Sequence, residues 1–95
     1  MKLLSVKPSH LPEKKYDATF KKDDGRTKTT AFGARGMDDY TKTHDKDQRA
    51  RYIKRHAGDN LTDPTSAGAL SRNLLWGEST SMMANLANYR KRFNL

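Results

Sequence analysis

The residue types that could carry out chemistry in this 95-residue chain are three histidines, a group of aspartates and one serine beside an arginine. His10, His44 and His56 could ligate a metal, but a zinc site needs three or four converging ligands. No histidine lies four residues from another. We therefore expect His44 to help cap a helix and His56 to pack or cap near the end of the same helix. The sequence predicts no metal site and no cofactor.

The aspartates and the serine give weak signals of catalysis. Asp38, Asp39, Asp45 and Asp47 could form a carboxylate cluster for magnesium, but they lie among lysines on both sides of an expected loop. This placement favours helix capping and contact with solvent as the roles of these carboxylates. Ser71 lacks the Gly-x-Ser-x-Gly pattern of a nucleophile elbow, and the glycines of residues 33–36 lack the spacing of a phosphate-binding loop. The sequence therefore predicts that the protein is not an enzyme; a small nuclease is the enzymatic alternative.

Positive charge is the strongest functional signal. The chain holds 19 Lys and Arg against 11 Asp and Glu, a formal net charge of +8. Such an excess implies an acidic partner: nucleic acid, an acidic protein face or an anionic membrane surface. No apolar segment approaches the roughly 20 residues of a membrane span. The candidate partner- or phosphate-binding residues lie on two expected helices and are Arg49, Arg51, Lys54, Arg55, Arg90, Lys91 and Arg92.

These cations admit three interpretations. They could contact phosphates, which need little more than a positive surface. They could pair with carboxylates of a protein partner, because arginine is enriched at interfaces. Alternatively, their long stems could cover a thin core while the charged ends remain in water.

The first half of the chain predicts a tail and a β-hairpin. Residues 1–15 carry prolines and lysines with little periodicity, which predicts an extended N-terminal tail. Residues 16–20 alternate apolar and polar side chains, and Asp24-Gly25 is a strong hairpin signal before a second strand over residues 27–32. Because a two-stranded hairpin is not stable alone, we expect it to lie on helices.

The second half predicts three short helices. Thr43 or Asp45 can cap a helix over residues 45–57; with Asp45 as the cap, Gln48 forms a variant of the capping box. Asp63 is the expected cap of a second helix that has Pro64 at its first position and ends before Gly77. A third helix is expected from near Ser79 to residue 93, where apolar residues recur at helical spacing.

The sequence therefore predicts an α+β fold: a tail over residues 1–15, then one small basic domain over residues 16–95. There is no cysteine to form a disulfide, and only 14 of the 95 residues are Leu, Ile, Val or Phe, so the core is thin and partner contacts should add stability. The expected core residues are Phe20, Phe32, Ile53, Leu70, Leu74, Trp76, Leu86 and Phe93.

Several blocks of sequence, taken together and in this order, carry a resemblance to a known family. They include Ala31-Phe32-Gly33-Ala34-Arg35-Gly36, Arg51-Tyr52-Ile53-Lys54-Arg55-His56, Ala67-Gly68-Ala69-Leu70-Ser71-Arg72 and Tyr89-Arg90-Lys91-Arg92-Phe93. Over about residues 32–93 the chain resembles a family of small basic uncharacterised proteins encoded by large double-stranded DNA viruses of algae and protists. The resemblance implies a viral setting and brings no catalytic residues with it.

Two functional hypotheses follow. The first is a non-catalytic structural or interaction protein, a minor capsid component that bridges other viral structural proteins through its basic helices and extended tail. The expected location is the virion, and the host cytoplasm or nucleus during assembly. The alternative is a sequence-tolerant nucleic-acid-binding protein that coats or packages the viral genome.

Overall fold

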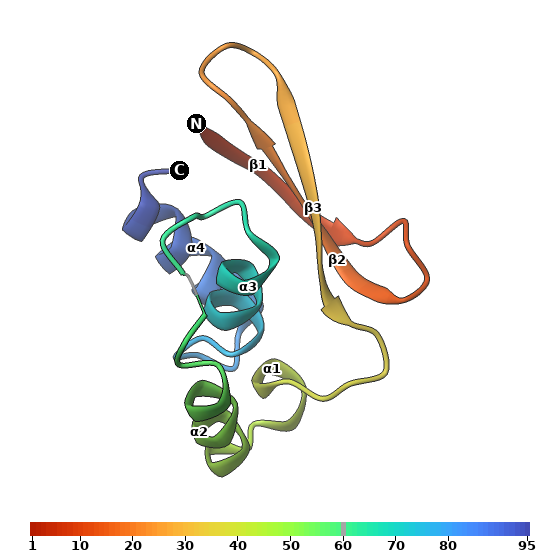
Figure 1. The fold of residues 1–95 in the computed structure, drawn as a ribbon, viewed down its shortest axis with the longest axis vertical. Helices are drawn as coiled ribbons and strands as arrows, with labels where there is room; N and C mark the ends of the chain where they lie inside the picture. The colour runs from red at the N-terminus through yellow and green to blue at the C-terminus, as the bar shows by residue number, and fades with distance from the viewer. Residues whose placement is uncertain (60) are drawn as a thin grey trace.

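A computed structural model of the chain describes residues 1–59 and 61–95 and shows a three-stranded antiparallel sheet with helices against one of its faces (Figure 1). The protein is thus a small α+β domain, as the sequence predicts. The elements, in chain order, are β1 (Lys2–Pro8), β2 (Lys14–Lys21), β3 (Thr27–Ala34), α1 (Tyr40–Thr43), α2 (Lys46–Arg55), α3 (Ala67–Leu70), the π-helical segment η1 (Ser71–Leu75) and α4 (Met82–Phe93).

The predicted hairpin is confirmed. β2 and β3 pair in an antiparallel register that closes with Lys21 opposite Thr27. Gly25 adopts φ +86° in the turn, a conformation that costs glycine little and other residues more. The turn is fixed by a hydrogen bond of 2.7 Å from the Lys22 N–H to the Arg26 carbonyl.

The prediction of an unpaired N-terminal tail needs correction. The segment is extended, but it forms the edge strand β1, with Leu3 opposite Phe20 and Val6 opposite Ala18. A β-bulge lies between Leu3 and Ser5. Leu3 is 3% exposed, so the strand contributes to the core. The alternation that marks a half-buried strand is broken by the bulge, which explains why the local pattern does not reveal it.

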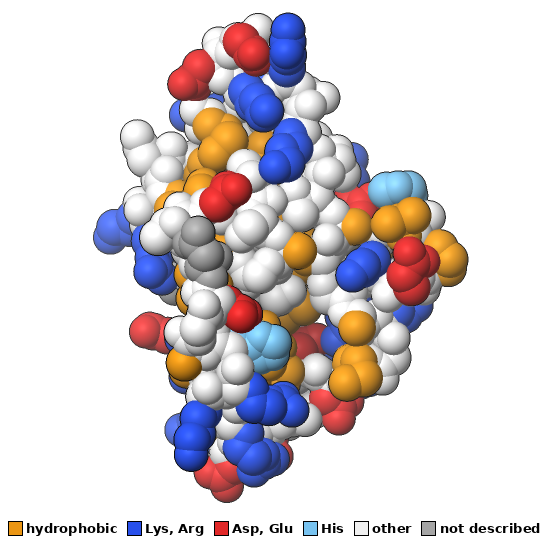
Figure 2. Space-filling view, in the orientation of Figure 1, with side chains coloured by type: hydrophobic (Ala, Val, Ile, Leu, Met, Phe, Trp, Pro, Cys, Tyr) orange, Lys and Arg blue, Asp and Glu red, His pale blue; other side chains and the backbone are white. Residues whose placement is uncertain are grey.

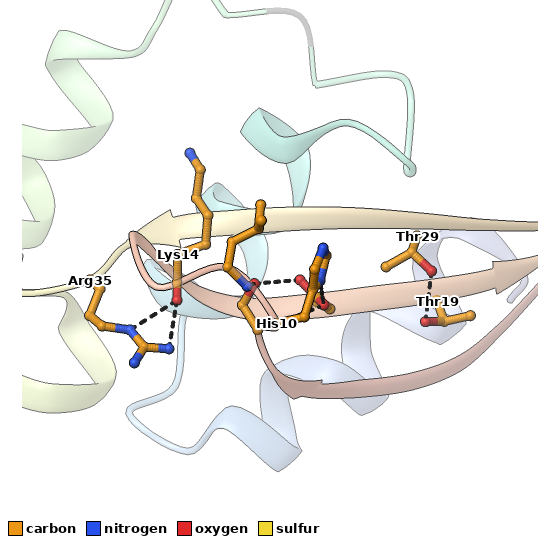
Figure 3. Close-up of polar contacts among 8 residues, drawn as sticks. His10, Lys14, Thr19, Thr29 and Arg35 are labelled. Atoms are coloured by element: carbon orange, nitrogen blue, oxygen red, sulfur yellow. Dashed lines mark hydrogen bonds and ion pairs between the residues drawn. The ribbon is translucent and has the colours of Figure 1, made fainter.

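Side-chain hydrogen bonds fix the connections at one end of the sheet (Figure 3). The Asp17 carboxylate accepts a hydrogen bond of 2.6 Å from the Ser9 hydroxyl and pairs with His10 in the β1–β2 loop. Arg35, just after β3, donates from Nε and Nη2 to the Lys14 carbonyl at 3.1 and 3.0 Å. The loop and the end of β3 are therefore tied to β2 by polar contacts.

The helices differ from expectation mainly at their starts. The second helix begins later than predicted: Ser66 caps α3 by accepting a hydrogen bond of 3.1 Å from the Ala69 N–H. Asp63 instead accepts from the backbone N–H and the hydroxyl of Thr65, at 2.9 and 2.8 Å. This turn uses the carboxylate that was expected to cap the helix, so the helix starts three residues further on. The short helix α1 was expected to be a loop.

A turn built on Asn85 links η1 to α4. The Asn85 side-chain NH₂ donates to the backbone carbonyls of Leu74 and Ser79 at 3.0 and 2.8 Å, and the Asn85 side-chain oxygen accepts from the Ser79 N–H at 3.0 Å. Ser79 is therefore occupied in the turn, and Ser81 caps α4 instead. A Cβ atom on Gly77 would lie 2.3 Å from the Asn73 carbonyl oxygen, so only glycine fits there.

The core lies between the sheet and the segment from α3 to α4. Among the predicted core residues, Phe20, Phe32, Leu70, Leu74 and Trp76 are buried. Leu86 and Phe93 are half-buried and pack against this cluster. Ile53 is only half-buried, and no residue of α2 is fully buried. The buried cluster also contains residues outside the expected core set: Leu3, Ala18, Tyr40, Leu75 and Tyr89.

Candidate functional site

Helix α2 presents most of its surface to solvent. Asp45 caps its start, since the carboxylate accepts hydrogen bonds of 3.0 Å from the N–H groups of Asp47 and Gln48. Lys54 and Arg55 occupy its last turn, where cations interact favourably with the helix dipole. No residue of α2 is buried. The helix is thus well capped and is not a core element.

Tyr52 and Arg49 attach α2 to the end of η1 and the turn that follows it. Tyr52 stacks on Trp76, with ring centroids 4.3 Å apart and an interplanar angle of 6°, and its other side stacks on His56 at 4.2 Å. Arg49 donates from Nε to the carbonyls of Trp76 and Gly77 at 3.1 and 2.9 Å. These contacts fix which side of α2 faces the domain and leave the opposite side uncovered.

The structure divides the seven predicted binding cations into two groups. Arg49, Arg90 and Arg92 hold the fold: Arg90 Nη2 donates to the Leu3 carbonyl at 2.9 Å, and Arg92 Nη1 donates to Asn73 Oδ1 at 3.1 Å. The other four are exposed and make no such contact, and no carboxylate in residues 1–59 or 61–95 forms an ion pair with them; Arg92 is exposed too, but its guanidinium is held by Asn73. These four are Arg51, Lys54, Arg55 and Lys91.

Exposed cations gather over α2. Figure 2 shows Lys and Arg side chains gathered at the lower end of the molecule, over α2. Lys91 lies on another helix, in the last turn of α4, whose C-terminal end is away from α2 in the helical layer (Figure 1). We call Arg51, Lys54 and Arg55 the α2 surface. The sequence placed the candidate cations on two helices. In the fold, Arg51, Lys54 and Arg55 remain exposed on α2, whereas Arg49 of α2 and Arg92 of α4 bind neighbouring parts of η1 and the turn that follows it.

A cleft of about 750 Å³ lies beside the α2 surface, between residues at the ends of β2 and β3 and the segment from α2 to η1. Tyr52 and Trp76 line it, and Arg55 reaches it from α2. Lys15 and Asp39 also line it and form an ion pair in which both side chains are largely buried. Much of the charge in the cleft is therefore neutralised within the chain, while Arg55 remains available.

The residues considered for catalysis have structural contacts. His44 is the left-handed C-cap of α1, with φ 57°. His56 is the C-cap of α2 and pairs with Asp59 at 2.8 Å. Asp39 caps α1 by accepting from the Lys42 N–H. Across residues 1–59 and 61–95, no three His, Cys, Asp or Glu side chains gather in a group that could hold a metal ion.

Several groups have pKa values shifted by their surroundings. Hydrogen bonds from His10 and Ser9 lower the pKa of Asp17 from 3.8 to about 2. Burial raises the pKa of the Tyr89 phenol, and the charge of Asp63 adds to this effect. Burial also raises the pKa of Tyr52. Each shift follows from a contact that stabilises the fold, and none marks a poised acid or base.

Sequence reasoning missed the role of Arg72. In the sequence Arg72 stands out only as the neighbour of Ser71. In the fold its Nη1 donates to the Trp76 carbonyl at 3.0 Å, the same acceptor that Arg49 binds. Its pKa is lowered by desolvation and by the nearby charges of Arg49 and Arg92. No local pattern signals this, because the three arginines come from α2, η1 and α4.

Fold and surface together define a small α+β domain that displays a basic, solvent-exposed helix. Residues 4–56, more than half of the chain, match a family of unknown function (DUF5754), so the chain belongs to this family. The matched region runs from β1 through α2 and so includes the α2 surface.

No curated protein and no solved structure matches the chain. In the part of the chain that the structure describes, no helix has the length and apolar character needed to cross a bilayer.

Proposed function

We propose that the protein is a non-catalytic interaction protein that docks on an acidic face of another protein through the α2 surface. One observation carries this proposal: α2 buries none of its residues in its own domain while it exposes Arg51, Lys54 and Arg55 without carboxylate partners among the described residues. Cations without a carboxylate partner in their own chain are free to pair with the carboxylates of another protein. Arginine suits this role because its planar guanidinium can bind a carboxylate through two hydrogen bonds.

The arrangement of the cations also supports a bridging role. The α2 surface and Lys91 lie on different helices, α2 and α4, so two neighbours could be contacted at once. The paired strand β1 replaces the free tail that the sequence suggested for this role. Bridging therefore depends on the basic residues of these two helices.

We further propose that the neighbours are viral structural proteins and that the protein is a minor capsid component. This setting rests on the resemblance to small basic proteins of large double-stranded DNA viruses. It implies a location in the virion, and in the host cytoplasm or nucleus during assembly.

Mass spectrometry of purified particles tests the capsid assignment. The protein is expected among the particle proteins at a fixed ratio to the major structural proteins, and it should remain after nuclease treatment of opened particles. Detection in infected cells together with absence from particles would refute the assignment.

The second candidate is a protein that coats or packages the genome, and the same exposed cations favour it. Phosphate contacts make binding fall with salt, with a log–log slope of about −0.9 for each contact to duplex DNA. Replacing Arg51, Lys54 and Arg55 together by glutamine should then make this slope less negative by about 3. A matched control removes three exposed lysines elsewhere, Lys2, Lys7 and Lys22. Absence of DNA binding near physiological salt would exclude this candidate.

A further inference from the structure

Three arginines meet at the turn between η1 and α4. Arg49 Nε and Arg72 Nη1 both donate to the Trp76 carbonyl oxygen, at 3.1 and 3.0 Å. Because they share this acceptor, the two donor nitrogens lie within about 6 Å of each other. Arg92 Nη1 donates to the side-chain carbonyl of Asn73 at 3.1 Å. Guanidinium groups from α2, η1 and α4 thus gather around η1 and the turn that follows it.

This arginine cluster (Arg49, Arg72 and Arg92) has only neutral hydrogen-bond acceptors. Within residues 1–59 and 61–95, no carboxylate lies within ion-pair distance of any of the three. Each guanidinium has five N–H donors, and the contacts to the turn use only one nitrogen of each. Like charges this close repel one another unless an anion lies between them.

A hollow of about 310 Å³ adjoins the cluster and is lined by Arg72, Arg92, Asn73, Asn85, Asn88 and Tyr89, with Gly77 and Glu78. Its volume is near the lower end of the range for small-ligand sites. Glu78, the one acidic residue in the lining, is exposed. Three cations against one exposed carboxylate leave an excess of positive charge that a dianion would balance.

We propose that this hollow is a phosphoryl-binding site in which Arg72 and Arg92 contact the oxygens of a phosphate group, while Arg49, which shares the Trp76 carbonyl with Arg72, adds its charge without lining the hollow. A phosphoryl dianion offers several oxygen acceptors to two forked guanidinium donors, a geometry for which arginine is well suited. Desolvation and the neighbouring arginines lower the pKa of Arg72, and a bound dianion would offset both effects. The site shares no residue with the α2 surface.

Inorganic phosphate, pyrophosphate and a nucleoside 5′-monophosphate are suitable probes, added to about 10 mM to cover millimolar affinity, with binding followed by ¹H–¹⁵N NMR. Saturable shifts are expected at residues 72–78 and 88–92. Tighter binding of the monophosphate would identify a phosphate ester as the ligand, whereas equal or tighter binding of inorganic phosphate would identify the free ion. Absence of saturable shifts with all three probes would overturn the proposal.

Neighbouring positions on α4 provide a matched pair of variants. Arg92→Gln removes a lining cation and should weaken binding about tenfold or more, whereas Lys91→Gln removes an equal charge at an exposed position outside the hollow and should change binding less than about twofold. Glu78→Gln should strengthen binding. Equal losses in the two α4 variants, or no gain in Glu78→Gln, would overturn the proposal. A variant lacking the α2 surface should bind phosphate normally, so this site and the docking function can fail independently.

Discussion

Asn85 is the side chain on which the turn between η1 and α4 depends, and Asn85→Ala is expected to destabilise the domain strongly. Asn85 is 2% exposed. It donates to the carbonyls of Leu74 and Ser79 and accepts from the Ser79 N–H, over distances of 2.8 to 3.0 Å. Alanine at this position would leave these three backbone groups without their partner.

The magnitude follows from these contacts. A typical hydrogen bond contributes about 1 kcal/mol net, and a buried group left unsatisfied costs about 1–3 kcal/mol. Three lost contacts therefore predict a fall in the free energy of unfolding of about 3 kcal/mol or more. For a domain of this size, each kcal/mol corresponds to a Tm change of roughly 4–8 °C. The expected fall in Tm is thus on the order of 12–24 °C.

Urea unfolding followed by far-UV circular dichroism measures the effect. Asn88→Ala is the matched control, because Asn88 is exposed on the same helix and its replacement should change stability by less than about 0.5 kcal/mol. If Asn85→Ala and Asn88→Ala unfold at the same urea concentration, the turn does not depend on Asn85 and this reasoning is wrong.

Three further predictions concern single side chains. The pKa of Asp17 is lowered to about 2, so the stability that its ionised form contributes is complete above about pH 4 and is lost as the pH falls toward 2. In Asp17→Asn, the free energy of unfolding measured with urea should therefore fall less steeply over this acidic range. Tyr89→Phe removes a hydrogen bond of 2.7 Å to the Pro64 carbonyl and should cost about 1 kcal/mol. Because the pKa of Tyr89 is raised, the wild type should lose more stability than this variant above about pH 10. Tyr52→Ala removes the stack on Trp76 and should speed hydrogen exchange in α2 but not in β2; equal exchange in α2 would contradict this.

Local sequence signals predicted the elements whose determinants lie within a few residues. The hairpin followed from Asp24-Gly25, and the start of α2 followed from Asp45. β1 could not be predicted locally, because the strand is defined by its pairing with β2 and because a β-bulge interrupts the alternation of apolar and polar residues. The start of the second helix was misplaced because Asp63 and Ser66 are both good caps, and only the contacts of Thr65 decide between them.

The candidate site was harder to predict because a cation's role depends on contacts far along the chain. Arg90 binds the carbonyl of Leu3, 87 residues away, and Arg49 binds that of Trp76, 27 residues away. In the sequence these arginines are indistinguishable from Arg51, which remains exposed. Composition predicted a basic surface, but only the fold shows which cations are available to a partner.

Cross-linking of purified particles with a carbodiimide, which joins a lysine amine directly to a carboxylate, tests the central claim most directly. Lys54 lies on the α2 surface, and Lys22 is an exposed lysine in the hairpin turn. Docking through α2 predicts that Lys54 is linked to Asp or Glu residues of another particle protein and that Lys22 is linked far less often. Cross-links spread equally over both lysines, or Lys54 joined only to residues of its own chain, would contradict the account.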